Sequence, residues 1–307
     1  VPPEDAAILR LAAQRIERFH ERQRQEGWLV TDEEGVELGQ SVLPLSRVGI
    51  YAPGGLASYP STVLMTAIPA RIAGVGEIIL VSPSRDGKLS PLIAAAAGLG
   101  GVTRIFKVGG AQAIAALAFG TASIPPVDKI VGPGNAYVAT AKKMVFGRVA
   151  IDMIAGPSEV LIIADGTGEA AFAAADMLAQ AEHDETASAL LLTPDEDFAR
   201  AVAADVDRQM QELPRLAIAS RSLASYGAVV VTRDLAEAVG LANRFAPEHM
   251  ELMVQHPREL LREIRNAGEV FLGMNTQEAL GDYLAGPNHV LPTGGTDDGT
   301  AQTMAGV

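Results

Sequence analysis

The stretch RFAPEHMEL, residues 244–252, places a glutamate and a histidine side by side in a chain that has five histidines. Neighbours diverge by about 100° on a helix and point to opposite faces of a strand, so neither element would direct both Glu248 and His249 into one site. A loop or the first turn of a helix could direct both. Pro247 suits the first helical position, where the helix dipole favours a charged carboxylate beside a neutral imidazole. The pair therefore predicts proton-transfer chemistry, with a surface turn as the alternative.

A second group of side chains has the types that bind metals. Gln180 and His183 stand three residues apart near the end of a predicted helix over 168–183, so they share one face of it. The glycine- and proline-rich loop 281–295 carries Asp282 and His289. Imidazole and carboxylate groups are common zinc ligands, and an amide oxygen could join them. Each pattern alone is also common in solvated helix ends and loops.

Two kinds of reaction fit these residues. With three metal ligands and Glu248 as the base, they suit a zinc hydrolase. With His249 as an additional proton acceptor, they suit the oxidation of an alcohol. The spacing of the residues leaves both reactions open.

The elements that must position these residues alternate between apolar strands and alanine-rich helices. The expected strands are SRVGIYAPGG, EIILVSP, RIFKVGG, DKIVGPG, EVLIIAD, SALLLTP, GAVVVT, MELMV and EVFLG. The intervening helices are expected near 61–73, 90–98, 111–119, 168–183, 195–212, 234–243 and 257–266. An amphipathic helix from Asp5 to about Gln25 precedes them. The alternation predicts an α/β fold of parallel strands in two similar halves, with helices on both faces.

Glycine-rich turns follow several of the expected strands, at 54–55, 109–110 and 132–135. Ligands of parallel sheets sit at the carboxyl ends of strands, where glycine lets the backbone approach a ligand and a following helix offers amide groups to a phosphate. A strict G-x-G-x-x-G is absent, so a dinucleotide would not bind through the usual fingerprint. Because glycine also ends strands for structural reasons, one turn alone does not identify a ligand.

Composition narrows the class of protein. The 307 residues, 48% hydrophobic and 20% charged, suit an α/β enzyme of about two domains. A formal net charge of −13 disfavours nucleic acid and membrane surfaces as partners, and the lack of cysteine excludes thiolate metal sites. The first residues lack the order of a secretory signal, and the longest uncharged run, 108–127, contains two prolines. We therefore expect a soluble, cytoplasmic protein.

Several segments, in their order along the chain, resemble the signature blocks of the histidinol dehydrogenase family. They are VGIYAPGG, VGGAQAIAALAFGT, DKIVGPGNAYVATAK, IDMIAGPSEVLIIAD, LAQAEH, FAPEHMEL and GDYLAGPNHVLPTGG, from about residue 47 to residue 295. The family oxidises histidinol to histidine in two hydride transfers to NAD, with zinc in the site, as the last step of histidine biosynthesis. The resemblance thus implies an NAD-dependent alcohol and aldehyde oxidoreductase that acts as a homodimer.

The resemblance assigns roles to individual residues. The implied zinc ligands, which also contact substrate, are Gln180, His183 and Asp282. Glu248 and His249 become the acid/base pair: His249 takes the alcohol proton, and Glu248 activates water for aldehyde hydration. The implied substrate contacts also include Ser158, His249 and His289.

The resemblance also implies how NAD is held and how the chain is divided. The matching NAD-binding positions are Tyr51, Gln112 and Asn135. Two incomplete Rossmann-like domains are implied, one inserted in the other. Residues 1–50 and 160–307 would form a discontinuous zinc and substrate domain, and 51–159 would be the inserted NAD-binding domain.

The ends of the sequence depart from the family pattern. Family members usually have a longer N-terminal arm and a C-terminal small domain that supplies a histidine to zinc and a glutamate to substrate, whereas no histidine follows His289. We expect a shortened member with a reduced zinc site, a site filled by another group, or a fragment. The remaining alternatives are a dehydrogenase of another small alcohol and a non-catalytic NAD-binding remnant. The presence of both Glu248 and His249 argues against the remnant.

Overall fold

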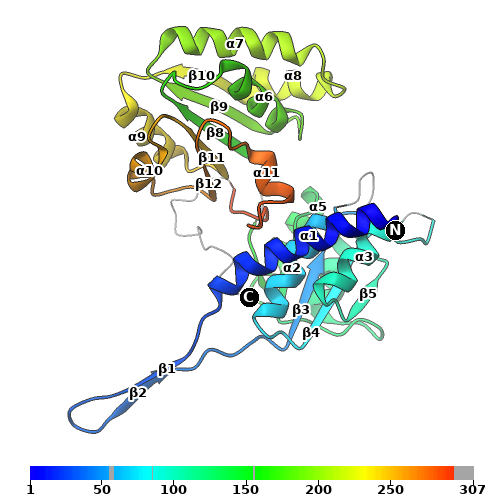
Figure 1. Ribbon diagram of the computed structural model, residues 1–307. Coiled ribbons are helices and arrows are strands. Elements are labelled where there is room, and N and C mark those ends of the chain that lie inside the picture. The colour runs from blue at the N-terminus through cyan, green and yellow to red at the C-terminus, as the bar shows by residue number, and fades with distance from the viewer. Residues whose placement is uncertain (55–58, 85, 155, 294–307) are drawn as a thin grey trace. The chain divides into compact units, whose positions relative to one another are not determined.

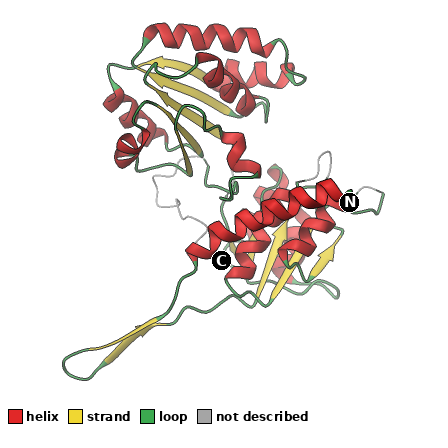
Figure 2. Ribbon diagram, viewed as in Figure 1, coloured by secondary structure: helices red, strands yellow, loops and turns green. Residues whose placement is uncertain are grey.

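The computed structural model describes residues 1–54, 59–84, 86–154 and 156–293 (Figure 1). Internal contacts divide the described chain into two compact units, one formed by 1–154 with 281–290 and the other by 156–280 with 291–293. Each unit contains its own five-stranded parallel sheet, with helices on both faces (Figure 2). The predicted α/β fold class is confirmed.

In the first unit, the sheet has the strand order β5-β4-β3-β6-β7. Its strands are β3 (Arg47–Tyr51), β4 (Glu77–Val81), β5 (Arg104–Phe106), β6 (Lys129–Val131) and β7 (Ala150–Ile151). Its helices are α1 (Pro3–His20), α2 (Pro60–Ile72), α3 (Pro91–Gly100), α4 (Gly110–Phe119) and α5 (Ala136–Val145). Val48 and Ile50 face a core with α1, α2 and α3, whereas Ile79 and Val81 face a second core with α4 and α5. Burial on both faces explains why these strands are uniformly apolar.

The second unit repeats this topology with the strand order β10-β9-β8-β11-β12. Its strands are β8 (Glu159–Ala164), β9 (Ser188–Thr193), β10 (Gly227–Val231), β11 (His249–Met253) and β12 (Glu269–Leu272). Its helices are α6 (Ala170–Ala181), α7 (Glu196–Met210), α8 (Leu216–Tyr226), α9 (Leu235–Phe245) and α10 (Pro257–Leu260). Helix α11 (Glu278–Tyr283) begins in this unit and ends in the segment 281–290 of the first. In both sheets the first strand is central and the strand order reverses between the first and fourth strands. The prediction of two similar halves is therefore correct at the level of topology.

Some elements were not predicted from the sequence. They are the antiparallel hairpin β1 (Trp28–Thr31) with β2 (Glu37–Gln40), the short strand β7, and the helices α5, α8 and α11. All residues of β1 and β2 are exposed, so the hairpin lacks the one-sided burial that makes a strand recognisable.

Helix α1 packs against α2 and α3, which places the first helix in the same unit as the strands that follow it. The prediction of an inserted domain over 51–159 stays a prediction. Within the described ranges, no helix combines the length and apolar character needed to cross a membrane. The predicted cytoplasmic location also stays a prediction.

Candidate active site

The Glu248–His249 pair lies at the start of a strand. Helix α9 ends at Phe245, Ala246 takes a left-handed conformation with φ of 54°, and β11 begins at His249. The helix start considered at Pro247 is therefore wrong, whereas the expected strand MELMV is present, because HMELM pairs with β8 on one side and β12 on the other. The alternative of a surface turn is also wrong, since Glu248 is 6% exposed and His249 is 4% exposed.

The bend before β11 allows the two neighbouring side chains to approach each other. The Nδ1 atom of His249 lies 3.8 Å from Oε2 of Glu248. The same Oε2 accepts a hydrogen bond of 3.2 Å from the backbone N–H of Glu159, which fixes the carboxylate. The His249 ring packs against Phe271 with 6.1 Å between ring centroids. The two proton-transfer groups are thus held together in a buried setting.

A second carboxylate near His249 was missed by the sequence analysis. Oε1 of Glu278, the first residue of α11, lies 3.5 Å from Nδ1 of His249, and Glu278 is 8% exposed. The backbone N–H of Glu278 donates a 3.0 Å hydrogen bond to Oε1 of Glu251. Glu278 stands four residues before Asp282, one helical turn away, and this spacing is the signal that could have identified it.

Glu251 belongs to a pair of interacting carboxyl groups. It is two residues beyond His249 in β11 and 1% exposed, and its side chain meets Asp176 of α6. Burial raises the pKa of Asp176 to about 6, and burial together with the charge of Asp176 raises the pKa of Glu251 well above its usual range. Both shifts favour the neutral carboxyl over the carboxylate.

Gln180 and His183 lie at the end of α6. Gln180 is in the last turn and 2% exposed, and its Nε2 atom has no hydrogen-bond partner among the described residues. His183 is exposed and follows the helix, which ends at Ala181 instead of at the predicted residue 183. A buried amide group that lacks a hydrogen-bond partner among the described residues is suited to bind a ligand. Rotating the amide by 180° exchanges its oxygen and nitrogen, so either atom can face that ligand.

These residues of the second unit lie at the amino edge of its sheet. Glu248 and Ser158 directly precede β11 and β8, and α6 leads from β8 back to the start of β9, where Gln180 is found. The carbonyl oxygen of half-buried Ser158 accepts a 3.0 Å hydrogen bond from the N–H of Ser188, the first residue of β9. These candidate residues thus lie opposite the carboxyl edge, where ligands of parallel sheets usually sit.

The residues predicted to bind NAD lie at the carboxyl edge of the other sheet. Tyr51 ends β3, exposed Gln112 is in the first turn of α4, and exposed Asn135 caps α5 by accepting a 3.1 Å hydrogen bond from the N–H of Val138. The N–H of Gly110 donates to the Tyr51 hydroxyl at 3.1 Å. Strands β3 and β6 flank the point where the strand order reverses, which is the usual crevice for a nucleotide in such sheets.

A glycine contact brings the turn after β6 against β3. A Cβ atom on Gly132, whose φ is 110°, would lie 2.1 Å from the backbone oxygen of Tyr51. Only glycine therefore allows this close approach. The contact holds the turn that carries Asn135 against the end of β3 at Tyr51.

Asp282 and His289 belong to the segment 281–290 of the first unit. Nε2 of His289 lies 3.2 Å from Oγ of Ser61 in α2, and the Asn288 amide donates a hydrogen bond to the carbonyl of Met65. Across the described ranges, no three His, Asp or Glu side chains form a ready metal site. The meeting of Asp282 with Gln180 and His183 stays a prediction.

Comparison with known proteins identifies the family of the chain. The family model of histidinol dehydrogenase matches residues 1–307. Histidinol dehydrogenase from Geobacter metallireducens is 61% identical over 96% of this chain and 68% of its own length. That from Syntrophotalea carbinolica is 61% identical over 96% of this chain and 69% of its own.

A solved structure agrees with these sequence matches. The crystal structure of histidinol dehydrogenase from Elizabethkingia anophelis is 42% identical, with a TM-score of 0.92 over 95% of this chain and 68% of that chain. The chain thus spans about two thirds of the length of each of these relatives. It belongs to the histidinol dehydrogenase family.

Proposed function

We propose that this chain catalyses the NAD-dependent oxidation of L-histidinol through histidinal to L-histidine, the last step of histidine biosynthesis. The observation that carries the proposal is the buried group formed by Glu248, His249 and Glu278, with Nδ1 of His249 within 3.8 Å of both carboxylates. Two oxidations in one site require two different proton transfers, and neighbouring imidazole and carboxylate groups supply both.

His249 acts as the base in the alcohol step. Because Nδ1 faces the two carboxylates, proton transfer with the substrate hydroxyl is assigned to Nε2. The carboxylate of Glu278 stabilises the imidazolium that forms when His249 accepts this proton and holds the ring in its orientation. His249 is thereby suited to take the proton as hydride leaves the carbinol carbon.

Glu248 activates water for hydration of the aldehyde. Its Oε2 is held by the N–H of Glu159, so the carboxylate keeps one orientation without losing its basic oxygens. The hydrated aldehyde then carries a new hydroxyl group and undergoes the second oxidation. Two neighbouring residues thus serve the two half-reactions.

Two groups from outside the chain complete the proposed site. NAD would be held by Tyr51, Gln112 and Asn135, and zinc by Gln180, His183 and Asp282. When bound, NAD supplies the hydride acceptor and zinc supplies a Lewis acid that orients the nitrogens of the substrate. The buried amide end of Gln180 has no hydrogen-bond partner among the described residues, and it supports the zinc assignment with the amide oxygen turned to that position. Ser158 and His289 would add contacts to the substrate.

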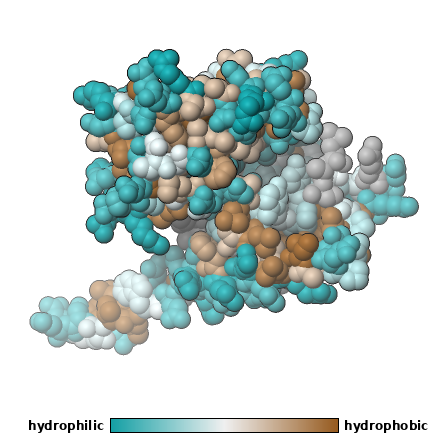
Figure 3. Space-filling model, turned by 45° about the horizontal axis from the view of Figure 1, so that its top comes forward, coloured by the Kyte–Doolittle hydropathy of each residue, from teal (hydrophilic) through white to brown (hydrophobic). Residues whose placement is uncertain are grey.

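We also propose that two copies of the chain form a homodimer through the β1–β2 hairpin. Trp28, Val30 and Leu38 share one face of the hairpin and are 53%, 53% and 55% exposed. Figure 3 shows hydrophobic surface on this hairpin. A two-stranded hairpin alone is marginally stable in water, so a covering surface would stabilise it. Light scattering should find a dimer that Val30→Lys/Leu38→Lys dissociates and Glu33→Lys does not. A monomeric unmodified chain would refute the hairpin contact.

The activity is tested by NADH formation with zinc present. L-histidinol should yield two NADH per molecule, and simpler amino alcohols without an imidazole should react far more slowly. Equal rates with those alcohols would indicate a dehydrogenase of another small alcohol. Binding of NAD without turnover of any alcohol would indicate the non-catalytic alternative.

A further inference from the structure

A buried ion pair in the first unit binds one residue of the turn after β6. Lys142, in the last turn of α5, pairs with Asp152, which follows β7, and their side chains are 3% and 0% exposed. Nζ of Lys142 donates to the carbonyl of Gly132 at 2.9 Å. The N–H of Gly132 donates to Oδ2 of Asp152 at 2.6 Å. The pair therefore binds both backbone polar groups of one glycine.

Gly132 is the residue that sets the path of this turn. It follows β6 directly, and its positive φ and its contact with the backbone of Tyr51 exclude any side chain. Asn135 is three residues later and begins α5, the helix that carries Lys142. The same helix is thus fixed to the turn at both ends, through the Asn135 cap and through Lys142.

The carboxylate of Asp152 accepts hydrogen bonds both from the turn after β6 and from the backbone that follows β7. Oδ1 also accepts a 2.7 Å hydrogen bond from the N–H of Met153. Asp152 also interacts with Lys129 in β6. Burial lowers the pKa of Lys129, and the charge of Asp152 opposes this shift. The carboxylate therefore has fixed partners on the strand end, the turn and the helix.

We propose that Lys142 and Asp152 are positioning residues for NAD, which hold the 132–135 turn in the conformation that binds the cofactor. The inference rests on the proposed function, in which Tyr51 and Asn135 contact NAD. A buried ion pair often contributes little net stability compared with apolar residues of similar size. Its value here lies in binding both polar groups of Gly132, which a hydrophobic pair would leave without partners.

Two variants separate the effect of positioning the 132–135 turn from the loss of stability caused by an unpaired buried charge. Lys142→Met leaves Asp152 without its ion-pair partner, whereas Lys142→Met/Asp152→Asn removes both charges. The double variant keeps an acceptor for the N–H of Gly132 but loses the donor to its carbonyl. NAD affinity is measured by titration of the full chain without substrate, together with the KM for NAD, the KM for histidinol and the unfolding temperature.

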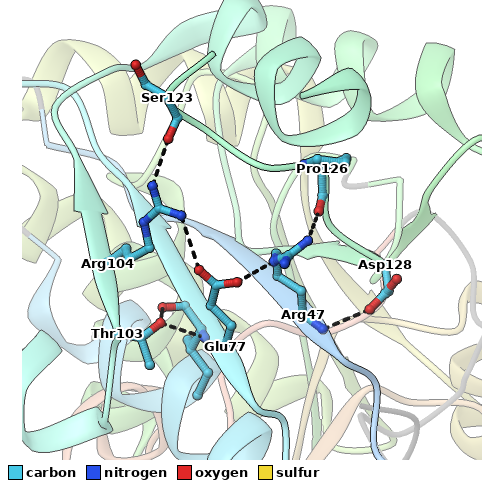
Figure 4. A network of polar contacts seen from close by, with 8 residues as sticks. Arg47, Glu77, Thr103, Arg104, Ser123, Pro126 and Asp128 are labelled. Atoms are coloured by element: carbon cyan, nitrogen blue, oxygen red, sulfur yellow. Dashed lines mark hydrogen bonds and ion pairs between the residues drawn. The ribbon is translucent and has the colours of Figure 1, made fainter. Parts of the chain in front are cut away.

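We expect both variants to raise the dissociation constant and KM for NAD at least tenfold, with the KM for histidinol changed less than twofold. The matched control lies at the amino edge of the same sheet, where Arg47 pairs with Glu77 at 2.5 Å (Figure 4). Arg47→Met/Glu77→Gln should lower the unfolding temperature and leave the KM for NAD within twofold.

A folded double variant with unchanged NAD affinity would overturn the inference, as would equal effects on the two KM values. An unmodified chain that binds NAD but does not oxidise histidinol would refute the proposed function, while NAD affinity would still decide the role of the pair. An unmodified chain that does not bind NAD would overturn both.

Discussion

Oε1 of Glu278 lies 3.5 Å from Nδ1 of His249, although the two residues are on different elements and are separated by β12 in the chain. This contact places a carboxylate behind the imidazole in the way that acid/base sites orient and stabilise a histidine. The hydrogen bond from the N–H of Glu278 to Glu251 fixes the start of α11 and so fixes this carboxylate.

Glu278→Gln should slow alcohol oxidation about ten- to a hundredfold, which corresponds to the roughly 1.5–3 kcal/mol of a charged hydrogen-bonding group. The amide keeps the shape of the side chain but removes the charge that stabilises the imidazolium. Steady-state rates with histidinol would measure the loss. Exposed Glu259→Gln is the control, and equal rates in the two variants would remove Glu278 from the mechanism.

Glu248→Gln should impair the aldehyde step more than the alcohol step, because only the aldehyde requires an activated water. The amide still accepts the hydrogen bond from Glu159, so the fold should be preserved. NADH formation from histidinal and from histidinol would be compared in single-turnover experiments. A parallel loss of both rates would contradict this division of roles.

His249→Asn should slow the alcohol step by about a hundredfold or more, as expected for loss of a general base. Single-turnover rates of histidinol oxidation, compared with those of the unmodified chain at the same pH, would measure the loss. An alcohol step that proceeds at the original rate would assign the base to another residue.

Glu251→Gln should reduce the loss of stability at high pH. The folded chain raises the pKa of Asp176 from 3.8 to about 6 and raises that of Glu251 well above its usual range. The folded state therefore binds protons at these carboxyl groups more tightly than the unfolded state, and its stability decreases as pH rises from about 4 through 6 and above. Glutamine supplies its own N–H to Asp176 and an oxygen to the N–H of Glu278.

Thermal unfolding from pH 5 to pH 8 would measure the effect of Glu251→Gln. The variant should unfold at a higher temperature than the unmodified chain at pH 8, and the difference should shrink toward pH 5. Exposed Glu212→Gln should follow the unmodified chain throughout. Identical pH dependence in all three proteins would mean that folding does not raise the pKa values of this carboxyl pair.

Gln180→Leu should lower the zinc content without lowering stability. The buried Nε2 atom has no hydrogen-bond partner among the described residues, so an apolar side chain of similar size removes an unsatisfied group from the core. Zinc per chain would be measured by elemental analysis after dialysis, and the unfolding temperature in the presence of a chelator. A stable variant with full zinc content would exclude Gln180 as a ligand.

The apolar runs allowed every strand of both sheets except the two-residue β7 to be predicted, because residues such as Val48, Ile50 and Ile162 are buried by helices on two faces. The hairpin β1–β2 was missed since its residues are exposed on both faces. Helix α5 was missed because its exposed positions include Tyr137 and Met144, which obscure the usual apolar and polar faces.

The site was predictable wherever the sequence places chemical groups next to each other or next to glycine turns. Glu248 and His249 were singled out because they are adjacent, and the strand MELMV after them was expected, but the neighbours of β11 were not, since its pairing with β8 and β12 depends on residues far away in the chain. Glu278 and Asp176 were missed for the same reason: each is a single carboxylate whose partner is brought to it by the fold.

The two sheets share one topology but carry their candidate residues at opposite edges, and this reverses the sign of the electrostatic field at those residues. At the carboxyl edge of the first sheet, α4 and α5 begin, so their positive ends and free N–H groups suit the phosphates of a dinucleotide. At the amino edge of the second sheet, α6 and α9 end, so their negative ends favour a metal cation and a protonated amine. One repeated fold can therefore attract an anionic cofactor with one copy and a cationic substrate with the other.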